Sequence, residues 1–465
     1  MKYIAFGLAL IAAFPAAAVC SVSRRCLALL MGMAFVVILK FDSTALNFIS
    51  YEFYRGTARG MEVSLAYIIS FSVILSLLFR GRKIKLFPDF GAVLFLFYFL
   101  WSVVSAVENN NLMIVSTALV EGRNLLDFPL MGRMVSFFEI WKMVMLYIVF
   151  IAVYGFLDFS RNAKALIQSL AIVVIICFLM VVKQHVTGVY QAKGPFPHQN
   201  SMALFMMLLG PVFFSIYVNL PRSVFRMVCT FAFVCASGAL FRTYSRGAMM
   251  CYPVAAGLTA ALSVFCKFKP RVIMRLVPIT LCGLLGVAAM MPRIIERFAL
   301  APKSSGDTRK YLAQTAANVM RTRPWTGIGV NNWSVYVNTH PEVLGDPEYR
   351  PSGASDKSVG IVETIYLLVG AECGIPGLVL LVIWLLYYWI VSFRLCFKLA
   401  GTQWFYLPAG LFGGLTGCCL QSALEWVLKQ QLNFLMLMVC FAVLSWLNRN
   451  WFRLKQEELA ERSQA

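Results

Sequence analysis

The chain has 465 residues, of which 60% are hydrophobic and only 13% are charged, and this composition excludes an ordinary soluble domain. Its formal net charge of +20 does not indicate nucleic-acid binding, because the basic residues are spread between apolar runs and no basic tract carries interleaved aromatic residues. The thirteen cysteines show no CxxC or Cys/His spacing, so we expect neither a metal site nor a disulfide framework.

Apolar runs near the length of a bilayer crossing follow one another along the chain. They predict an all-α polytopic membrane protein with about 12–13 transmembrane helices and one large external loop that contains amphipathic helices. The thirteen candidate runs are 3–20, 27–41, 62–79, 90–107, 137–158, 164–182, 201–218, 225–241, 247–266, 273–291, 375–393, 404–427 and 431–447.

Basic residues orient these runs. The connections 80–85 and 267–275 and the C-terminal tail are rich in Lys and Arg, so the positive-inside bias assigns them to the cytoplasm. The alternation of the runs then places four segments on the external side, namely 108–136, 183–200, 242–246 and 292–374.

Four regions follow from this topology. An N-terminal bundle (1–291, about ten candidate spans) precedes an external catalytic loop (292–374), three C-terminal transmembrane helices (375–447) and a cytoplasmic tail (448–465). Residues 1–20 fit either an extra N-terminal span or a signal peptide that is cleaved, and the sequence leaves both alternatives open.

Segment 183–200 leads directly into a membrane helix. Asn200 or Ser201 can cap this helix, and its N-terminus, with Lys193 and His198 nearby, favours an anion. Capping alone would explain Asn200 or Ser201, but it does not explain the basic residues. We therefore treat Lys193, His198 and Asn200 as candidate substrate-binding residues.

Two arginines lie in the short external connection 242–246, where the orientation bias disfavours them. Arg242 fits equally well a side chain that reaches the lipid headgroups or one that binds substrate. Arg246 begins the next helix, and its guanidinium can enter a polar cavity, which makes it a candidate functional residue.

The external loop carries an amphipathic pattern over 308–323, with Arg309 at its start and Arg321 and Arg323 at its end. Pro324–Val330 then predicts a turn. A further helix is expected from Glu363 through Tyr366, and Gly374–Gly377 should break it before the next spanning helix.

Four motifs in this order resemble the O-antigen ligase/polymerase (Wzy-C) superfamily of bacterial inner-membrane glycan transferases: Gly194–Asn200, Ser245–Gly247, Thr308-Arg309 with Arg323–Gly329, and Tyr366-Leu with Glu372–Gly377. The resemblance implies a metal-independent, GT-C-like glycosyltransferase without a cofactor, which uses a polyprenyl-diphosphate-linked glycan. Arg246 and Arg309 match the family's motif arginines and would hold the diphosphate, since a guanidinium binds phosphate oxygens in pairs. Arg321 and Arg323 are expected to contact headgroups.

One motif departs from the family pattern. Ligases of this family resemble His-Asn-x-Tyr-Leu before the Gly-Ile-Pro-Gly break, whereas this chain has Glu363 and Tyr366 in the corresponding positions. A carboxylate can act as a general base if its surroundings raise its pKa. Glu363 is therefore the predicted base, although a structural carboxylate at a helix N-terminus is an equal alternative, and His340 in the loop is a second source of a basic group.

We interpret the chain as a polymerase of exopolysaccharide or O-antigen type that acts at the external face of the bacterial cytoplasmic membrane. A ligase to lipid A core or an oligosaccharyltransferase to a protein hydroxyl is the alternative within the family. A secondary transporter or a flippase is the alternative outside it, although no paired halves are visible. The implied partners are the lipid-linked donor, an acceptor glycan, membrane lipids, and a flippase and chain-length regulator.

Overall fold

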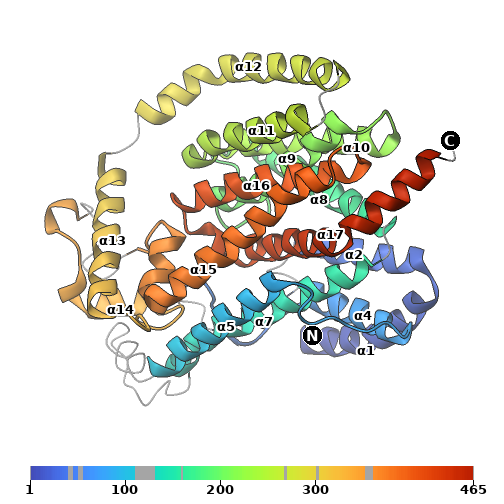
Figure 1. The fold of residues 1–465 in the computed structure, drawn as a ribbon. Coiled ribbons are helices and arrows are strands. Elements are labelled where there is room, and N and C mark those ends of the chain that lie inside the picture. The colour runs from blue at the N-terminus through green and yellow to red at the C-terminus, as the bar shows by residue number, and fades with distance from the viewer. Residues whose placement is uncertain are drawn as a thin grey trace.

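The computed structural model describes residues 2–39, 45–50, 56–109, 131–158, 161–266, 270–299, 303–350 and 360–463. Helices make up most of this part of the chain and pack into one elongated bundle (Figure 1). The all-α polytopic fold class that the sequence predicts is confirmed.

Each of the thirteen predicted apolar runs overlaps one helix of the bundle. These helices are α1 (Lys2–Val22), α2 (Arg24–Ile38), α4 (Leu65–Phe79), α5 (Phe90–Glu108), α7 (Met131–Phe156), α8 (Arg161–Val186), α9 (Gln199–Asn219), α10 (Val224–Arg242), α11 (Arg246–Cys266), α12 (Pro270–Ala299), α15 (Ile365–Lys398), α16 (Tyr406–Ser422) and α17 (Gln431–Ser463). Within the described residues, eight helices are long and apolar enough to cross a membrane by length and composition. A total of about 12–13 crossings stays a prediction.

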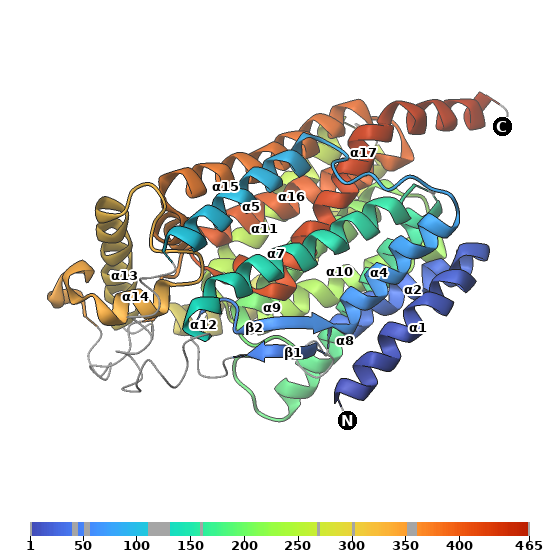
Figure 2. The same cartoon turned by 90° about the horizontal axis from the view of Figure 1, so that it is seen from below.

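The remaining elements are short. The strands β1 (Ala45–Ser50) and β2 (Gly60–Ser64), which the sequence did not predict, pair antiparallel as a hairpin on one side of the bundle (Figure 2). The predicted amphipathic helix at 308–323 is confirmed as α13 (Lys303–Thr322), and α14 (Trp333–Thr339) follows it. Four single 3-10 turns complete the set: η1 (Pro341–Val343), η2 (Pro347–Tyr349), η3 (Gln403–Phe405) and η4 (Val427–Lys429).

Helix α9 lies at the centre of the bundle, and nearly all of its side chains are buried. Glycines of α16 allow the two helices to touch. A Cβ atom at Gly410 would lie 2.4 Å from Val212 Cα, and one at Gly414 would lie 2.6 Å from the Leu208 carbonyl oxygen. Small residues at such an interface let backbones approach closely, which is how helices gain van der Waals contact within a bilayer.

The two ends of the bundle differ. Helices α13 and α14 and the start of α15 gather at one end, and the C-terminus lies at the other (Figures 1 and 2). Helix α12 connects these ends (Figure 1). Its start packs on the bundle, where Val272 is buried, and its side chains over 280–286 are exposed all round. The predicted tail 448–465 is largely a continuation of α17, which extends to Ser463.

Candidate active site

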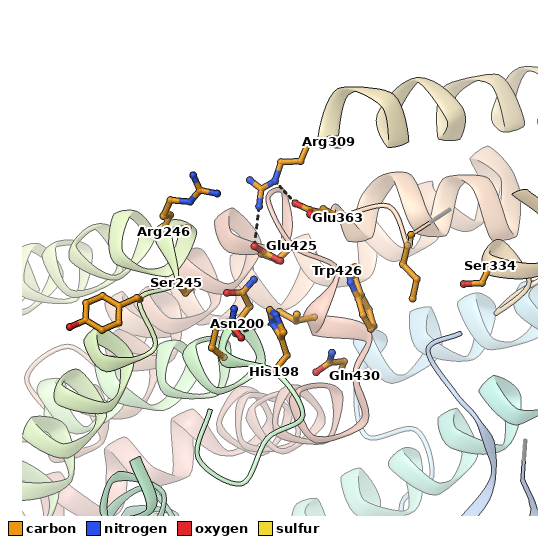
Figure 3. Close-up of a pocket in the computed structure, with 16 residues that line it drawn as sticks. His198, Asn200, Ser245, Arg246, Arg309, Ser334, Glu363, Glu425, Trp426 and Gln430 are labelled. Atoms are coloured by element: carbon orange, nitrogen blue, oxygen red, sulfur yellow. Dashed lines mark hydrogen bonds and ion pairs between the residues drawn. The ribbon is translucent and has the colours of Figure 1, made fainter. Parts of the chain in front are cut away.

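A cavity of about 480 Å³ opens at the end of the bundle that carries α13 and α14. It collects residues from segments far apart in the sequence, and most of them lie at helix ends or in connections (Figure 3). The lining residues are His198, Gln199, Asn200, Tyr244, Ser245, Arg246, Gly247, Arg309, Ser334, Gly360, Ile361, Glu363, Glu425, Trp426, Val427 and Gln430. Five residues that the sequence singled out therefore share one pocket: His198, Asn200, Arg246, Arg309 and Glu363.

Arg309 projects from α13 into this pocket between two carboxylates (Figure 3). Its Nε forms an ion pair with Glu363 Oε2, and its Nη2 lies 3.2 Å from Glu425 Oε1. The side chains of Arg309 and Glu363 are 39% and 33% exposed, whereas that of Glu425 is 10% exposed. The two carboxylates thus fix the direction of the guanidinium, and Glu363 is the one that solutes can reach.

Glu425 lies in the connection 423–430 between α16 and α17, outside the spanning helices. Burial raises the pKa of this carboxyl to about 7, and the negative charge of Glu363 contributes to the rise, while Arg309 and a hydrogen bond from Asn200 oppose it. The sequence analysis missed Glu425. The signal that could have found it is an acidic residue near the end of the otherwise apolar run 404–427.

Arg246 enters the pocket from a tight turn between α10 and α11. Thr243 Oγ1 accepts the Ser245 backbone N–H at 3.2 Å, and Tyr244 adopts a left-handed backbone with φ of 51°. A tyrosine in this region is held by its surroundings, here by stacking on Tyr190 with ring centroids 5.0 Å apart. The turn places Arg246 at the first position of α11, so it lines the pocket from a different helix than Arg309 (Figure 3).

His198 and Asn200 approach the pocket at the start of α9. The expected cap is corrected here: His198, rather than Asn200 or Ser201, is the N-cap, and its Nδ1 accepts the Asn200 backbone N–H at 3.2 Å. Partial desolvation and the charge of Lys193 lower the pKa of His198. A neutral His198 with Nδ1 as acceptor carries its proton on Nε2, so it is a hydrogen-bond donor there.

Three predicted binding residues lie at this end of the bundle but do not line the pocket. Arg242 Nη1 is 3.4 Å from Nδ1 of His185. Lys193 is exposed, and its backbone N–H donates to Gln184 Oε1 at 2.9 Å. The Tyr366 hydroxyl donates to the Cys419 carbonyl at 3.1 Å, so it joins α15 to α16.

The other three lie further along the external segment. Arg321 and Arg323 are exposed around the C-terminal end of α13, whereas Arg309 lies in the N-terminal half of this helix. His340 ends α14, where its ring stacks on Tyr336 with centroids 4.0 Å apart and its Nδ1 lies 2.9 Å from Thr339 Oγ1. These contacts occupy the imidazole of His340 within its own helix.

Buried ion pairs lie beneath the pocket. Lys429, in η4, pairs with Glu372 of α15, and Lys142 Nζ lies 2.7 Å from Glu139 Oε2 within α7. Lys142 also donates to the Lys429 carbonyl at 2.8 Å, which joins the two pairs. This network attaches the connection that carries Glu425 to α7 and α15.

The predicted turn and the predicted break in α15 contact each other. Gly374 has φ of 70°, where α15 is kinked, and the Ile375 N–H donates to the Pro324 carbonyl at 2.8 Å. The Gly329 N–H donates to the Glu372 carbonyl at 2.9 Å. Both predictions are confirmed, and the contact holds the segment after α13 against the helix that begins beside Glu363.

Fold and pocket together define an all-α polytopic membrane protein with a charged pocket at one end of its helix bundle. A family model of the Wzy-C family, described as O-Antigen ligase, matches residues 231–382. This match confirms the resemblance to the O-antigen ligase/polymerase superfamily and supports glycan transfer of the ligase or polymerase type in general. A comparison with curated proteins finds no match.

The matched residues run from within α10 to within α15 and include Arg246, Arg309 and Glu363. His198 and Glu425 line the same pocket but lie outside the match. The start of α9 carries the motif Gly194–Asn200 that the sequence singled out, although it lies outside the match, whereas the connection before α17 is recognised from the structure alone.

Proposed function

We propose that the chain extends a glycan by moving lipid-linked oligosaccharide from a polyprenyl diphosphate to an acceptor at the external face of the cytoplasmic membrane. The observation that carries this proposal is the meeting of Arg246, Arg309, Glu363 and Glu425 around one pocket. Such a pocket combines arginines that can bind a diphosphate with carboxylates that can accept a proton.

In the proposed reaction, an acceptor hydroxyl attacks the anomeric carbon of the donor sugar, and the bond from that carbon to the diphosphate oxygen breaks. Negative charge grows on the departing diphosphate. We assign its stabilisation to Arg309 and Arg246, since guanidinium groups form charge-assisted hydrogen bonds with phosphate oxygens and stay protonated.

We assign acceptance of the hydroxyl proton to Glu363. Its side chain is more exposed than that of Glu425, and its Oε2 is the atom that pairs with Arg309, which leaves Oε1 for the acceptor. Glu425 is held on one side by Arg309 and is hydrogen-bonded by Asn200. We assign Glu425 a different role, which is to orient Arg309 and to set the charge of the pocket.

The acceptor is proposed to be another repeat unit, so that the product is a polymer of exopolysaccharide or O-antigen type. This part rests on Glu363 in the position where the family's ligases resemble His-Asn-x-Tyr-Leu. A flippase that delivers the donor and a regulator of chain length are the proposed protein partners. Arg321 and Arg323, exposed around the end of α13, are proposed to contact lipid headgroups.

The test is to delete the gene in its native host and to compare surface polysaccharide with the glycans that remain on the polyprenyl carrier. Complementation uses the wild type, Arg309→Ala and Glu363→Gln. Lys310→Ala is the matched control, because Lys310 is the neighbour of Arg309 on α13 and its ammonium lies 3.6 Å from the Tyr349 ring centroid.

Single repeat units without long chains support the polymerase. Full-length chains that stay on the carrier instead identify a ligase. We expect Arg309→Ala and Glu363→Gln to fail to complement, at expression equal to the wild type, while Lys310→Ala complements. If neither glycan pool changes on deletion, transfer is the wrong function for this host; if Arg309→Ala complements fully, the site is wrong.

A further inference from the structure

Four arginines surround a second cavity at the opposite end of the bundle. This arginine cavity has a volume of about 540 Å³ and is lined by Tyr217, Pro221, Arg222, Arg226, Arg271, Met274 and Arg275. The residues come from the end of α9, the connection to α10, the first turn of α10 and the start of α12. Their charges belong to the end of the bundle that the positive-inside bias assigns to the cytoplasm.

Two of the arginines are anchored by the protein. Arg275 Nη1 donates to the carbonyls of Val218 and Leu220 at 2.7 and 2.8 Å. Arg226 Nη1 donates to the Leu220 carbonyl at 3.3 Å, and its guanidinium carbon lies 5.1 Å from the centroid of the Tyr217 ring. A guanidinium has five N–H donors, and each of these hydrogen bonds uses one of them. Most donors of both side chains therefore stay available to a ligand.

No carboxylate balances these charges within the described part of the chain. The residues that line the cavity include four arginines and no acidic side chain, and Arg275 is repelled by Arg226, Arg271 and Arg222. Like charges this close raise the free energy of the folded state unless an anion lies between them. Phosphate oxygens suit this arrangement, because they accept paired hydrogen bonds from arginine.

Exposed apolar side chains flank the cavity on the same two helices. Val224 and Met227 of α10 and Met274 and Val277 of α12 are all exposed. A soluble phosphate would satisfy the arginines but would leave this surface uncovered. A phospholipid would satisfy both, with its phosphate at the arginines and its acyl chains along the two helices.

We propose that the arginine cavity binds the headgroup of an anionic phospholipid in the leaflet opposite the candidate active site. The site lies where α12 docks on the bundle: Val272 is buried there, and the Tyr217 hydroxyl donates to the Arg275 carbonyl at 3.3 Å. Beyond this point α12 is exposed all round over 280–286 and leads to α13, which carries Arg309. The bound lipid would therefore stabilise the packing of the start of α12, and α12 leads to the helix that carries Arg309.

The test uses the full chain, purified in a neutral detergent and titrated with phosphatidylglycerol or phosphatidylcholine in mixed micelles, with the unfolding temperature as the readout. The variant is Arg222→Ala/Arg271→Ala, since both side chains are exposed and neither anchors α12. The matched control is Lys83→Ala/Lys85→Ala, which removes the same charge from exposed residues of another basic connection at this end.

We expect phosphatidylglycerol, but not phosphatidylcholine, to raise the unfolding temperature of the wild type. The phosphatidylglycerol concentration at half effect should rise about tenfold in Arg222→Ala/Arg271→Ala and stay unchanged in the control. An equal loss in the control, or no loss in the variant, overturns the proposal. So does inorganic phosphate that produces the full wild-type shift, since the site would then take a free anion.

The single change Arg222→Gln keeps the test decisive if the double variant does not fold. Arg222 lies in the connection between α9 and α10, outside both helices, and its side chain is exposed. It should raise the half-effect concentration about threefold. A value equal to the wild type overturns the proposal.

Discussion

Arg309 lies between two carboxylates with different surroundings. Glu363 is partly exposed and forms one ion pair, while Glu425 is enclosed and has a pKa raised to about 7 by burial and by Glu363. Glu425 therefore changes its charge near neutral pH while it contacts the guanidinium of Arg309. The charge of the pocket changes as Glu425 titrates, and the affinity for an anionic donor should follow.

The pH dependence of donor binding tests this role of Glu425. The pKa of Glu425 is raised, so the carboxyl is neutral below about pH 7 and adds a negative charge above it. The KM for a synthetic lipid-diphosphate donor should rise about tenfold from pH 6 to pH 8, since one added charge near the diphosphate opposes its binding. In Glu425→Gln the KM should stay near the low-pH value throughout.

The control for this measurement is Glu342→Gln, which neutralises an exposed carboxylate of the same external segment. It should keep the wild-type profile. A Glu425→Gln enzyme with an unchanged pH profile would show that another group titrates, and the assigned role of Glu425 would be wrong.

The positions of site residues could be predicted where a motif had a fixed order along the chain, but not where a residue stood outside such a motif. Arg246, Arg309 and Glu363 stand in motifs whose order along the chain indicated a shared face, and the structure brings all three to one pocket. Glu425 stands alone after an apolar run, so no spacing pointed to its partner. The ring of His340 stacks on its own helix, a contact that the sequence does not reveal.

At the scale of elements, the Pro324–Val330 turn is held against the kink of α15. Gly374 combines φ of 70° with ψ of −178°, a backbone region that is almost restricted to glycine. A Cβ at Gly374 would lie 1.9 Å from the Trp325 carbonyl oxygen. The kink therefore needs glycine for both conformation and space.

Gly374→Ala should lower the free energy of unfolding by at least about 3 kcal/mol, because it adds backbone strain to a direct clash. Thermal unfolding of the purified chain in detergent measures this change. Gly306→Ala is the control, since no atom lies within 4 Å of the Cβ position there and no positive φ is recorded. Equal unfolding temperatures for the two variants would contradict this account of the kink.

Element prediction was most accurate where hydrophobic periodicity dominates. The expected helix at 308–323 appears as α13 over 303–322, and the break at Gly374 lies where Gly-Ile-Pro-Gly indicated it. The β1–β2 hairpin was missed because its strands are short and β2 ends inside the region interpreted as the apolar run 62–79. Short apolar segments do not distinguish a strand from a helix by periodicity alone.

At the scale of the whole molecule, apolar runs determine which segments form the helices of the bundle. The pairing of the charged residues buried inside it depends on tertiary contacts. Glu139, Lys142, Glu372 and Lys429 are all buried and come from α7, α15 and η4. No sequence spacing connects Lys429 with Glu372, which are 57 residues apart. Glu139 and Lys142 lie one helical turn apart, but only folding joins them to Lys429 and Glu372, so the network as a whole was not predictable from the sequence.

Lys429→Met tests what the network contributes to the folded bundle. It leaves Glu372 buried without its ammonium partner, and breaking a buried pair in this way costs about 3–5 kcal/mol. Lys429→Met/Glu372→Leu removes both charges and should recover most of that loss, because an apolar pair of similar size avoids the desolvation cost. The unfolding temperature in detergent measures both variants.

The control is Arg453→Met, which breaks the exposed pair with Glu457 on α17, where the two groups are 3.6 Å apart. This change should cost no more than about 0.5 kcal/mol, since water and salt screen exposed pairs. If Lys429→Met loses as little stability as the control, water reaches the Lys429–Glu372 pair. A double variant no more stable than the single one would mean that the Lys429 side chain acts through its packing. The connection that carries Glu425 would then be held by packing instead of by charge.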